Sequence, residues 1–443
     1  MTIRVRFAPS PTGLLHVGNI RTALVNWLFA KAHQGQFLLR LDDTDLERSE
    51  EQYAQAIKED LAWLGLNHDL FARQSDRFDR YDAAIEQLKK TGRLYPCYEL
   101  PEELEFKRKR QLSRGEPPIY DRSALNLSES EQKKLETEGR QVYWRLKLTD
   151  ERIHWHDLVR EDVEFYGNKL SDPVLIRADG AYLYTLTSVV DDIDFAITHI
   201  VRGEDHVTNT AVQIQLFQAL GATVPTFAHL ALLTDEKGQG LSKRLASLGV
   251  SQFRAEGIEA MAINSFLARL GTSLAIEPKL TLAELFDGFD LGIFSRGAAK
   301  FNPLELKELN HKLLQITPYH HVKDRLKTLN VDRIDESLWN LIRGNLNALS
   351  DSLEWQTICF GEITPIIDDA AYIQQALTVL PKDPWSKETW KLWTTALKDA
   401  TGRSGKALFM PLRQALTGHD HGPEMQELLP ILGYDKVKQR LNG

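Results

Sequence analysis

The stretch that decides the fold is Ile3-Arg4-Val5-Arg6-Phe7-Ala8-Pro9-Ser10-Pro11-Thr12-Gly13-Leu14-Leu15-His16-Val17-Gly18-Asn19. Its first five residues alternate apolar and basic side chains, which is the period of a half-buried strand. From Ile20 to Leu28 apolar residues recur at helical spacing, which predicts a helix after the loop. A strand that leads through a glycine-containing turn into a helix points free N–H groups and the positive helix end at the space above the turn. The stretch therefore predicts an anion site, to which His16 adds a donor unless it is an incidental surface histidine.

The composition is that of an ordinary globular protein. Of 443 residues, 42% are hydrophobic and 26% are charged, and the length suits about two to four domains. No apolar run reaches the roughly 18 to 20 residues that a membrane helix needs, and no secretory signal is visible. The two cysteines, Cys97 and Cys359, lie far apart, which indicates a reducing, cytoplasmic setting without structural disulfides. The net charge of −8 does not indicate a nucleic-acid binder, so an RNA partner would need locally clustered basic residues.

Further strands and helices alternate along the first part of the chain. A strand over 37–41 runs into Asp42, and two more helical stripes follow up to Gly92. This alternation predicts a parallel, doubly wound sheet, in which ligands bind beyond the carboxyl ends of the strands. Asp42 is therefore expected beside the first loop.

The pattern changes near Cys97. A charged helix over 102–114 carries the basic run Lys107–Arg110, which is either a solvated helix face or an RNA contact. Residues 142–148 alternate like a strand, and the segments 174–178 and 181–186 flank Asp179-Gly180, which predicts a hairpin. We interpret this region as an α+β insertion between two halves of the sheet.

The sheet pattern resumes with a strand over 196–201, followed by Arg202-Gly203-Glu204-Asp205-His206. Another buried strand, over 227–233, leads into a charged, glycine-containing loop that ends in Leu241-Ser242-Lys243-Arg244. Beyond Gly249 only helical stripes are predicted.

Three segments carry a family resemblance. Pro9 to Gly18 resembles the first signature of the class I aminoacyl-tRNA synthetases in its glutamyl form, and Leu241 to Arg244 resembles the second, usually Lys-Met-Ser-Lys-Ser. The last part of the chain, over Gly402 to Gly418 (which includes Pro411 to Gly418) and Gly422 to Gly433, resembles the closing segment of bacterial glutamyl-tRNA synthetases. The resemblance implies an α/β fold: a split, doubly wound parallel (Rossmann-like) catalytic domain, an α+β acceptor-binding insertion and an all-helical anticodon-binding region. The expected divisions are two catalytic halves at 1–96 and 188–248, the insertion at 97–187, a helical stem-contact region at 249–309 and the anticodon-binding domain at 310–443.

The resemblance also implies ATP-dependent ligation of L-glutamate to tRNA(Glu) through a glutamyl-adenylate, with Mg²⁺ accompanying ATP. In that reaction the protein mainly positions groups and neutralises developing charge. His16 and the helix start would hold phosphates on one side, and Lys243 would close on the other; these two are the expected catalytic residues. The expected ATP-binding residues are Pro9, Ser10, Thr12, Gly13, His16, Gly18, Asn19, Glu204, Leu241, Ser242, Lys243 and Arg244.

Glutamate brings two carboxylates and one ammonium. Arg6 and Arg202, each at the end of a predicted strand, are suitable bidentate carboxylate partners. Alternatively, these arginines form ion pairs with neighbouring aspartates such as Asp191 and Asp192. Asp42 could pair with the ammonium. The glutamate-binding residues that the resemblance implies are Arg6, Ala8, Ser10, Asp42, Tyr184, Ser188 and Arg202.

The chain departs from the family pattern at several positions. Gly240 replaces the first lysine of the second signature, so one phosphate contact is missing or comes from Lys237. Asn19 replaces the second histidine of the first signature, and Ser188 stands where Asn is expected. Cys97 has no downstream cysteine pair, so we expect no structural zinc and no other metal site.

Three other functions stay open. Gly240 and the net acidity support a catalytically weakened paralogue that binds tRNA without charging it. A glutaminyl-tRNA synthetase would carry a β-barrel anticodon module, whereas the C-terminal third is predicted to be helical. A ligase that modifies tRNA would lack that region. Asn345 suggests that tRNA(Gln) is also charged. We expect a monomer without membrane contact.

Overall fold

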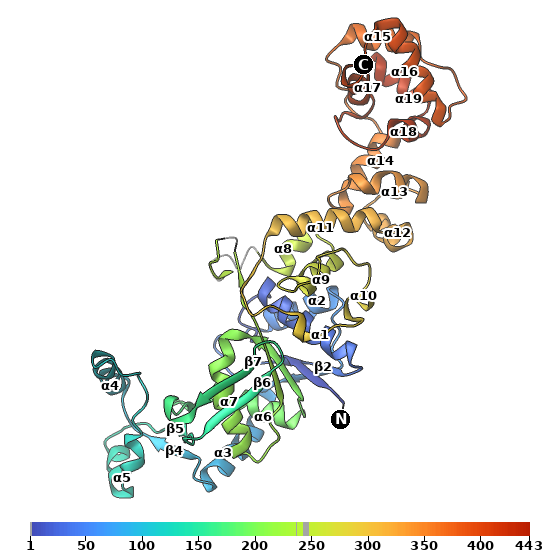
Figure 1. The fold of residues 1–443 in the computed structure, drawn as a ribbon. Coiled ribbons are helices and arrows are strands. Elements are labelled where there is room, and N and C mark those ends of the chain that lie inside the picture. Colours follow the sequence, from blue (N-terminus) through green and yellow to red (C-terminus); the bar gives the residue numbers. More distant parts are fainter. Residues whose placement is uncertain (1, 236, 242–247) are drawn as a thin grey trace. The chain divides into compact units, whose positions relative to one another are not determined.

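The computed structural model describes residues 2–235, 237–241 and 248–443 (Figure 1). The chain forms two compact units, and each is described by itself. Unit 1 comprises Met1–Gln252, Asn264–Ile276 and Thr281–Asn302, and unit 2 comprises Phe253–Ile263, Glu277–Leu280 and Pro303–Gly443. Within the described ranges, no helix has the length and apolar character to cross a membrane.

Unit 1 begins with three parallel strands, β1 (Arg4–Phe7), β2 (Gln36–Leu41) and β3 (Leu70–Arg73), paired in the order β1-β2-β3. Helix α1 (Val17–Ala32) connects the first two strands, and α2 (Glu51–Trp63) lies between the second and third. The strand, loop and helix predicted for the N-terminal stretch are confirmed.

A second group of strands continues the sheet. Its order is β7-β6-β10-β9; β10 is parallel to both of its neighbours and β7 is antiparallel to β6. Thr198 N donates to the Arg4 carbonyl at 2.9 Å and Arg4 N donates to the Thr198 hydroxyl at 2.9 Å, so β9 lies beside β1. The two groups therefore join into one split sheet, as predicted. The strands are β6 (Arg152–Asp157), β7 (Glu161–Tyr166), β9 (His199–Gly203) and β10 (Thr226–Leu230).

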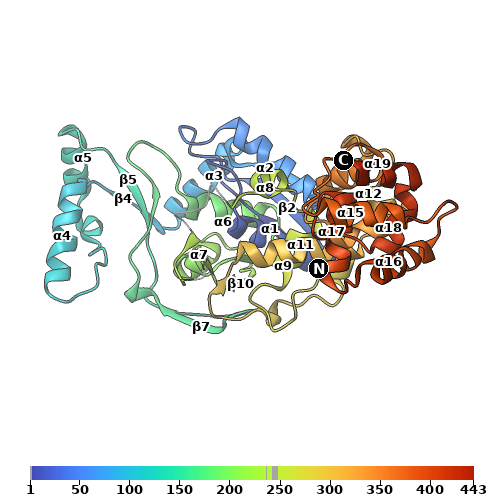
Figure 2. The ribbon, with the colours of Figure 1, turned by 90° about the horizontal axis from the view of Figure 1, so that it is seen from above.

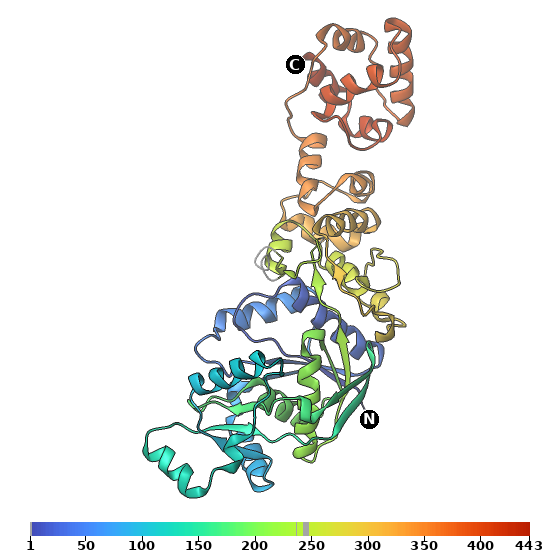
Figure 3. The same ribbon diagram turned by 60° about the vertical axis from the view of Figure 1, so that its left-hand side comes forward.

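Helices cover both faces of this sheet (Figures 1 and 3). Leu38, Ile200 and Phe227 share one buried cluster with the apolar side chains of three helices, α3 (Phe78–Lys90), α6 (Tyr184–Asp194) and α7 (Val207–Ala219). Helix α1 lies on the opposite face. Two covered faces explain why consecutive residues of β2, β9 and β10 are buried.

The insertion is a small antiparallel sheet in the order β4-β5-β8 with two helices beside it (Figure 2). The elements are β4 (Leu94–Cys97), α4 (Pro101–Ser113), α5 (Glu129–Thr137), β5 (Tyr143–Leu146) and β8 (Val174–Ile176). Arg140 pairs with Glu103, and Tyr98 donates to Glu136 at 2.7 Å, which ties the two helices together.

The prediction that residues 181–186 form the second strand of a hairpin is wrong. Gly180 does form a turn with φ of 84°, but the arm after it is a single bridge from Tyr182 to Ile176. Helix α6 begins at Tyr184, because the buried residues Leu186, Val189 and Val190 recur at helical spacing. The sequence also gave no sign that β6, inside the predicted insertion, pairs with β10 of the main sheet.

The segment between the sheet and the last part of the chain contains short elements. They are β11 (Leu233–Thr234), α8 (Val250–Ala255), α9 (Ala260–Arg269), α10 (Ala283–Phe286) and β12 (Ala299–Lys300). Strand β12 pairs with β11 over two residues, which is too short for the periodicity of the sequence to reveal.

The described part of unit 2 from Pro303 onward is helical, as predicted. Its core includes the fully buried Trp339 and Trp393. The helices are α11 (Pro303–Ile316), α12 (Tyr319–Thr328), α13 (Glu336–Ile342), α14 (Ser352–Phe360), α15 (Ala370–Thr378), α16 (Lys387–Thr401), α17 (Lys406–Thr417), α18 (Met425–Leu432) and α19 (Tyr434–Asn442).

Candidate active site

The loop between β1 and α1 is closed by His16, which caps the helix. His16 Nδ1 accepts a hydrogen bond from the backbone N–H of Gly18 at 3.1 Å. A Cβ at position 18 would lie 3.0 Å from His16 Cε1, so any other residue would push the His16 ring by a few tenths of an ångström. Burial lowers the pKa of His16, and the neutral ring with its Nδ1 in use carries its proton on Nε2. The sequence prediction of a donor at this place is consistent with that geometry.

Two adjoining cavities lie at the carboxyl ends of the central strands, of about 430 Å³ and about 590 Å³. Both sizes are typical of small-ligand pockets. The predicted residues that line the first are Arg6, Ala8, Pro9, Ser10, His16, Gly18, Asn19, Asp42, Tyr184 and Arg202. The predicted residues that line the second are Pro9, Ser10, Thr12, Gly13, His16 and Asn19.

Arg6 enters the first cavity from the end of β1. Its Nε lies 3.2 Å from Asp192 Oδ1, and both side chains are buried, so the ion pair considered as an alternative does form. Its two η nitrogens make no hydrogen bond to any described residue. Arg6 therefore combines an internal ion pair with free donors at the cavity.

Arg202 enters the same cavity from β9 with a different set of partners. Its Nη1 donates to the Tyr184 hydroxyl at 3.0 Å, its Nη2 to the Thr210 hydroxyl at 2.6 Å, and its Nε to His229 Nε2 at 3.3 Å. Among the described residues, no carboxylate lies within ion-pair distance of it. Burial lowers the pKa of Arg202, which reflects the cost of a buried charge that these neutral partners do not balance.

Asp42 lies at the end of β2 and is held by Arg40. Arg40 Nε and Nη2 donate to the two Asp42 oxygens at 2.7 Å and 3.1 Å, a bidentate pair. Burial raises the pKa of Asp42 to about 6 against the opposing effect of Arg40. The carboxylate thus titrates close to neutral pH while it lines the cavity.

Some predicted residues lie away from the cavities. Ser188 is fully buried and its hydroxyl accepts from Arg40 Nη2 at 3.3 Å. Glu204 accepts from Arg160 Nη1 at 2.5 Å, and Leu241 is buried. Ser242, Lys243 and Arg244 lie outside the described residues.

His206 also lines the first cavity, although it is not among the site residues predicted from the sequence. Its ring lies 5.5 Å from the Tyr184 ring, and burial together with the charge of Arg202 lowers its pKa to about 4. The signal was present, because His206 follows the carboxyl end of a central strand in the segment that begins with Arg202. Arg40 was also missed, although a lone charge within an apolar strand indicates a buried partner.

Among the described residues, no group of three or more His, Cys, Asp or Glu side chains is placed to hold a metal ion. Cys97 and Cys359 are both buried free thiols. The Cys97 sulfur lies 3.7 Å from the Tyr120 hydroxyl, which donates to Glu99 at 2.6 Å. Ser123 and Tyr143 donate to the same carboxylate at 2.9 Å and 3.0 Å.

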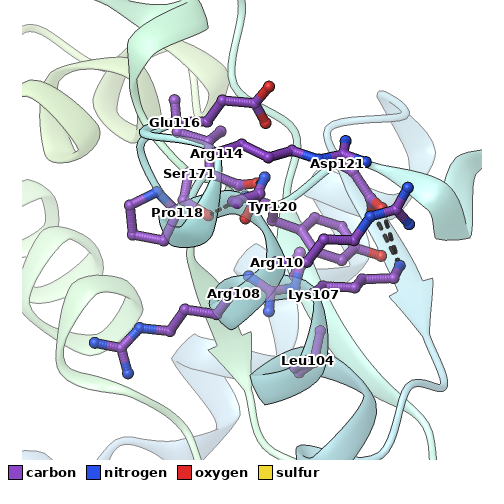
Figure 4. A pocket seen from close by; sticks show the side chains of 13 residues that line it. Leu104, Lys107, Arg108, Arg110, Arg114, Glu116, Pro118, Tyr120, Asp121 and Ser171 are labelled. Atoms are coloured by element: carbon purple, nitrogen blue, oxygen red, sulfur yellow. Dashed lines mark hydrogen bonds and ion pairs between the residues drawn. The ribbon is translucent and has the colours of Figure 1, made fainter.

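A separate pocket of about 480 Å³ lies in the insertion and is predominantly basic (Figure 4). Lys107 pairs with Asp121 at 3.1 Å, whereas Arg110 and Arg114 form no ion pair with the described residues. The Arg145 guanidinium lies 4.2 Å from the centre of the Tyr120 ring. The pocket offers cations to an anionic ligand, and the face of Tyr120 holds one of them, Arg145, by a cation–π contact.

Two family models match the chain. The model described as tRNA synthetases class I (E and Q), catalytic domain, matches residues 2–308, and that of an anticodon binding domain matches residues 361–443. The chain therefore belongs to the class I tRNA synthetases of the group that includes the glutamate and glutamine enzymes.

Close relatives cover the whole chain. The chain is 53% identical to a glutamate–tRNA ligase of Azospirillum brasilense, over 100% of this chain and 99% of the relative. It is 52% identical to glutamate–tRNA ligase 1 of Parvibaculum lavamentivorans, over 99% and 98% of the two chains. A glutamate tRNA ligase from Elizabethkingia meningosepticum, crystallised in complex with its amino acid, superposes with a TM-score of 0.87 at 29% identity, over 100% and 99% of the chains.

Proposed function

We propose that this chain activates L-glutamate with ATP and transfers it to the terminal adenosine of tRNA. The observation that carries the proposal is the pair of buried guanidinium groups, Arg6 and Arg202, with unused N–H groups at one cavity. Two fixed guanidinium groups match the two carboxylates of a dicarboxylic amino acid. The names of the relatives that the chain matches over their full length support the same activity.

In this proposal the amino acid occupies the cavity of about 430 Å³. One carboxylate meets Arg6 and the other meets Arg202, while the ammonium approaches Asp42. Glutamine would leave one guanidinium facing an amide, and sites of this kind reject such an analogue by roughly 10⁴-fold.

ATP occupies the cavity of about 590 Å³, where its phosphates meet the His16 N–H and the N-terminus of α1. The glutamate carboxylate attacks the α-phosphorus, and pyrophosphate leaves with the electrons of the broken P–O bond. Mg²⁺ arrives with ATP, because such ions are held mainly by the phosphates and water. Lys243, of the second signature, would supply a positive charge to the phosphates from the other side.

The tRNA contacts both parts of the chain. The basic pocket of the insertion receives phosphates of the acceptor end, and the helical region from 310 to 443 receives the anticodon. This assignment retains the division into 1–96, 97–187, 188–248, 249–309 and 310–443. We propose that tRNA(Gln) is charged besides tRNA(Glu), and that the chain acts as a monomer in the cytoplasm.

The test is a charging assay with ATP, radiolabelled glutamate and bacterial tRNA. We expect acid-precipitable label. Its absence would instead support a paralogue that binds tRNA without charging it. Separate transcripts of tRNA(Glu) and tRNA(Gln) decide the tRNA specificity, and label on tRNA(Glu) alone would remove the second substrate.

A further inference from the structure

Three neighbouring strands bring three buried polar side chains into a row behind the cavity. In the pairing of β10 with β9, His229 lies opposite Arg202. In the pairing of β10 with β6, Phe227 lies opposite Asp157, two residues before His229. The row runs from Asp157 through His229 to Arg202, and only Arg202 reaches the cavity wall.

Asp157 begins the row as a fixed carboxylate. Its Oδ1 accepts from the backbone N–H groups of Val159, Arg160 and His229 at 3.0–3.1 Å. Its Oδ2 lies 2.5 Å from His229 Nδ1. Burial favours the protonated acid, but the hydrogen bond and charge interaction with His229 and the backbone N–H groups of Arg160 and His229 together outweigh it and lower the pKa of Asp157. The group therefore stays ionised and can only accept.

The ionised Asp157 determines which nitrogen of His229 carries the proton. Nδ1 must donate to the carboxylate, and burial lowers the pKa of His229, so the ring is neutral and Nε2 bears a lone pair. That lone pair faces Arg202 Nε at 3.3 Å and the Thr210 hydroxyl at 2.9 Å. In the other tautomer two N–H groups would face each other.

The row leaves a defined part of Arg202 unused. A guanidinium has five N–H groups, and His229, Thr210 and Tyr184 engage one each. One N–H remains on each η nitrogen, so two donors are left for a carboxylate. Because all three partners are neutral, the positive charge of Arg202 also remains available.

We propose that Asp157 and His229 are positioning residues that orient Arg202 for a substrate carboxylate, by presenting a lone pair rather than a charge to its Nε. The inference rests on the proposed function, since the carboxylate is one of the two of glutamate. It adds to that function two residues that do not touch the substrate. A carboxylate in place of His229 would orient Arg202 equally well but would neutralise it.

The test compares three substitutions, His229→Leu, His229→Gln and Asp157→Asn. Leucine removes the acceptor, glutamine retains an oxygen at a similar reach, and asparagine at 157 can donate to Nδ1 and so favours the other tautomer. The KM values for glutamate and for ATP are measured in the tRNA-dependent reaction at saturating tRNA. We expect the glutamate KM to rise about tenfold or more for His229→Leu and Asp157→Asn and to stay within about threefold for His229→Gln, with little change for ATP.

A matched control separates positioning from a general loss of packing. Asp172 is also a buried aspartate, and it holds Tyr95 and Arg122 in the insertion rather than Arg202. Asp172→Asn should lower the unfolding temperature without changing the glutamate KM. The ¹⁵N spectrum of the imidazole rings provides a second readout, in which the His229 proton lies on Nδ1 in the parent and moves to Nε2 in Asp157→Asn.

The outcomes also separate this inference from the proposed function. If Arg202→Ala raises the glutamate KM while His229→Leu and Asp157→Asn leave it unchanged, the positioning role is wrong and the function stands. If Arg202→Ala itself leaves the glutamate KM unchanged, the placement of glutamate is wrong. Should His229→Leu fail to fold, two measurements decide the question: the imidazole tautomer of Asp157→Asn, and the glutamate KM of Asp157→Asn compared with that of His229→Gln.

Discussion

The two halves of the catalytic sheet hold their buried arginines with different partners. On the β1–β2 side, Arg6 and Arg40 pair with Asp42 and Asp192, so charge is balanced inside the protein. On the β9–β10 side, Arg202 is held by two hydroxyls and an imidazole. The first arrangement fixes the shape of the site, and the second leaves a charge for the ligand to neutralise.

The largest expected effect is on the free energy of unfolding, when a cation is removed from the charge-balanced β1–β2 side. Arg40→Met would leave the buried carboxylates of Asp42 and Asp192 without their shared cation, which costs about 3–5 kcal/mol of the free energy of unfolding. Urea denaturation measures the change. Lys31→Met, which removes a partly exposed pair with Asp69, is the control and should cost at most about 1 kcal/mol. Equal losses for both would mean that the buried cluster is no more important than a surface pair.

The next prediction concerns the β9–β10 side, where the charge of Arg202 is not balanced by a described carboxylate. Arg202→Ala removes the guanidinium that no described carboxylate neutralises, and the glutamate KM should rise roughly 100-fold or more while the ATP KM changes little. Steady-state kinetics with each substrate varied in turn measure the split. A parallel rise in both KM values would contradict a role specific to the amino acid.

The pH dependence distinguishes the carboxylate of Asp42 from the arginines. Its pKa is raised to about 6, so the group is ionised above that pH and protonated below it. We expect kcat/KM for glutamate to fall by up to about tenfold per pH unit below about 6, because a protonated acid cannot pair with the ammonium. His206, with a pKa lowered to about 4, titrates at lower pH and does not account for a fall that begins near pH 6.

The same raised pKa has the opposite effect on stability. Since the pKa of Asp42 is higher in the folded chain than its ordinary value of 3.8, its contribution to stability is present below that value and is lost as the pH rises through about 6. Asp42→Asn should flatten both the pH profile of kcat/KM for glutamate and the pH profile of the free energy of unfolding. If the profile of kcat/KM kept its shape in this variant, another group would be the titrating one.

The smallest effect concerns Ser188, which the family resemblance assigns to the glutamate pocket. Its hydroxyl contacts Arg40 rather than the cavity, so Ser188→Ala should cost about 1 kcal/mol of the free energy of unfolding and leave the glutamate KM unchanged. Paired measurements of unfolding and kinetics test this. A change in KM without a loss of stability would place Ser188 in the pocket itself.

Local patterns were predictable from the sequence, and long-range partners were not. Arg6 through Asn19 form strand, loop and helix because adjacent residues determine that geometry. The bond between Asp157 and His229 joins residues 72 apart, and only the pairing of β6 with β10 brings them together. The arm predicted over 181–186 failed because a turn signal does not show whether a strand or a helix follows.

The contact between β1 and β9 has a consequence for the two halves of the sheet, whose sequences are separated by the insertion. They are joined at the amino ends of β1 and β9, the ends that do not line the cavity, by hydrogen bonds between Arg4 and Thr198. A dicarboxylic amino acid bound by Arg6 from β1 and by Arg202 from β9 would link the same two strands a second time, at their carboxyl ends. Binding of the dicarboxylic amino acid would then slow amide hydrogen exchange along β1 and β9. An amino acid with a single carboxylate would leave the exchange rates of both strands unchanged.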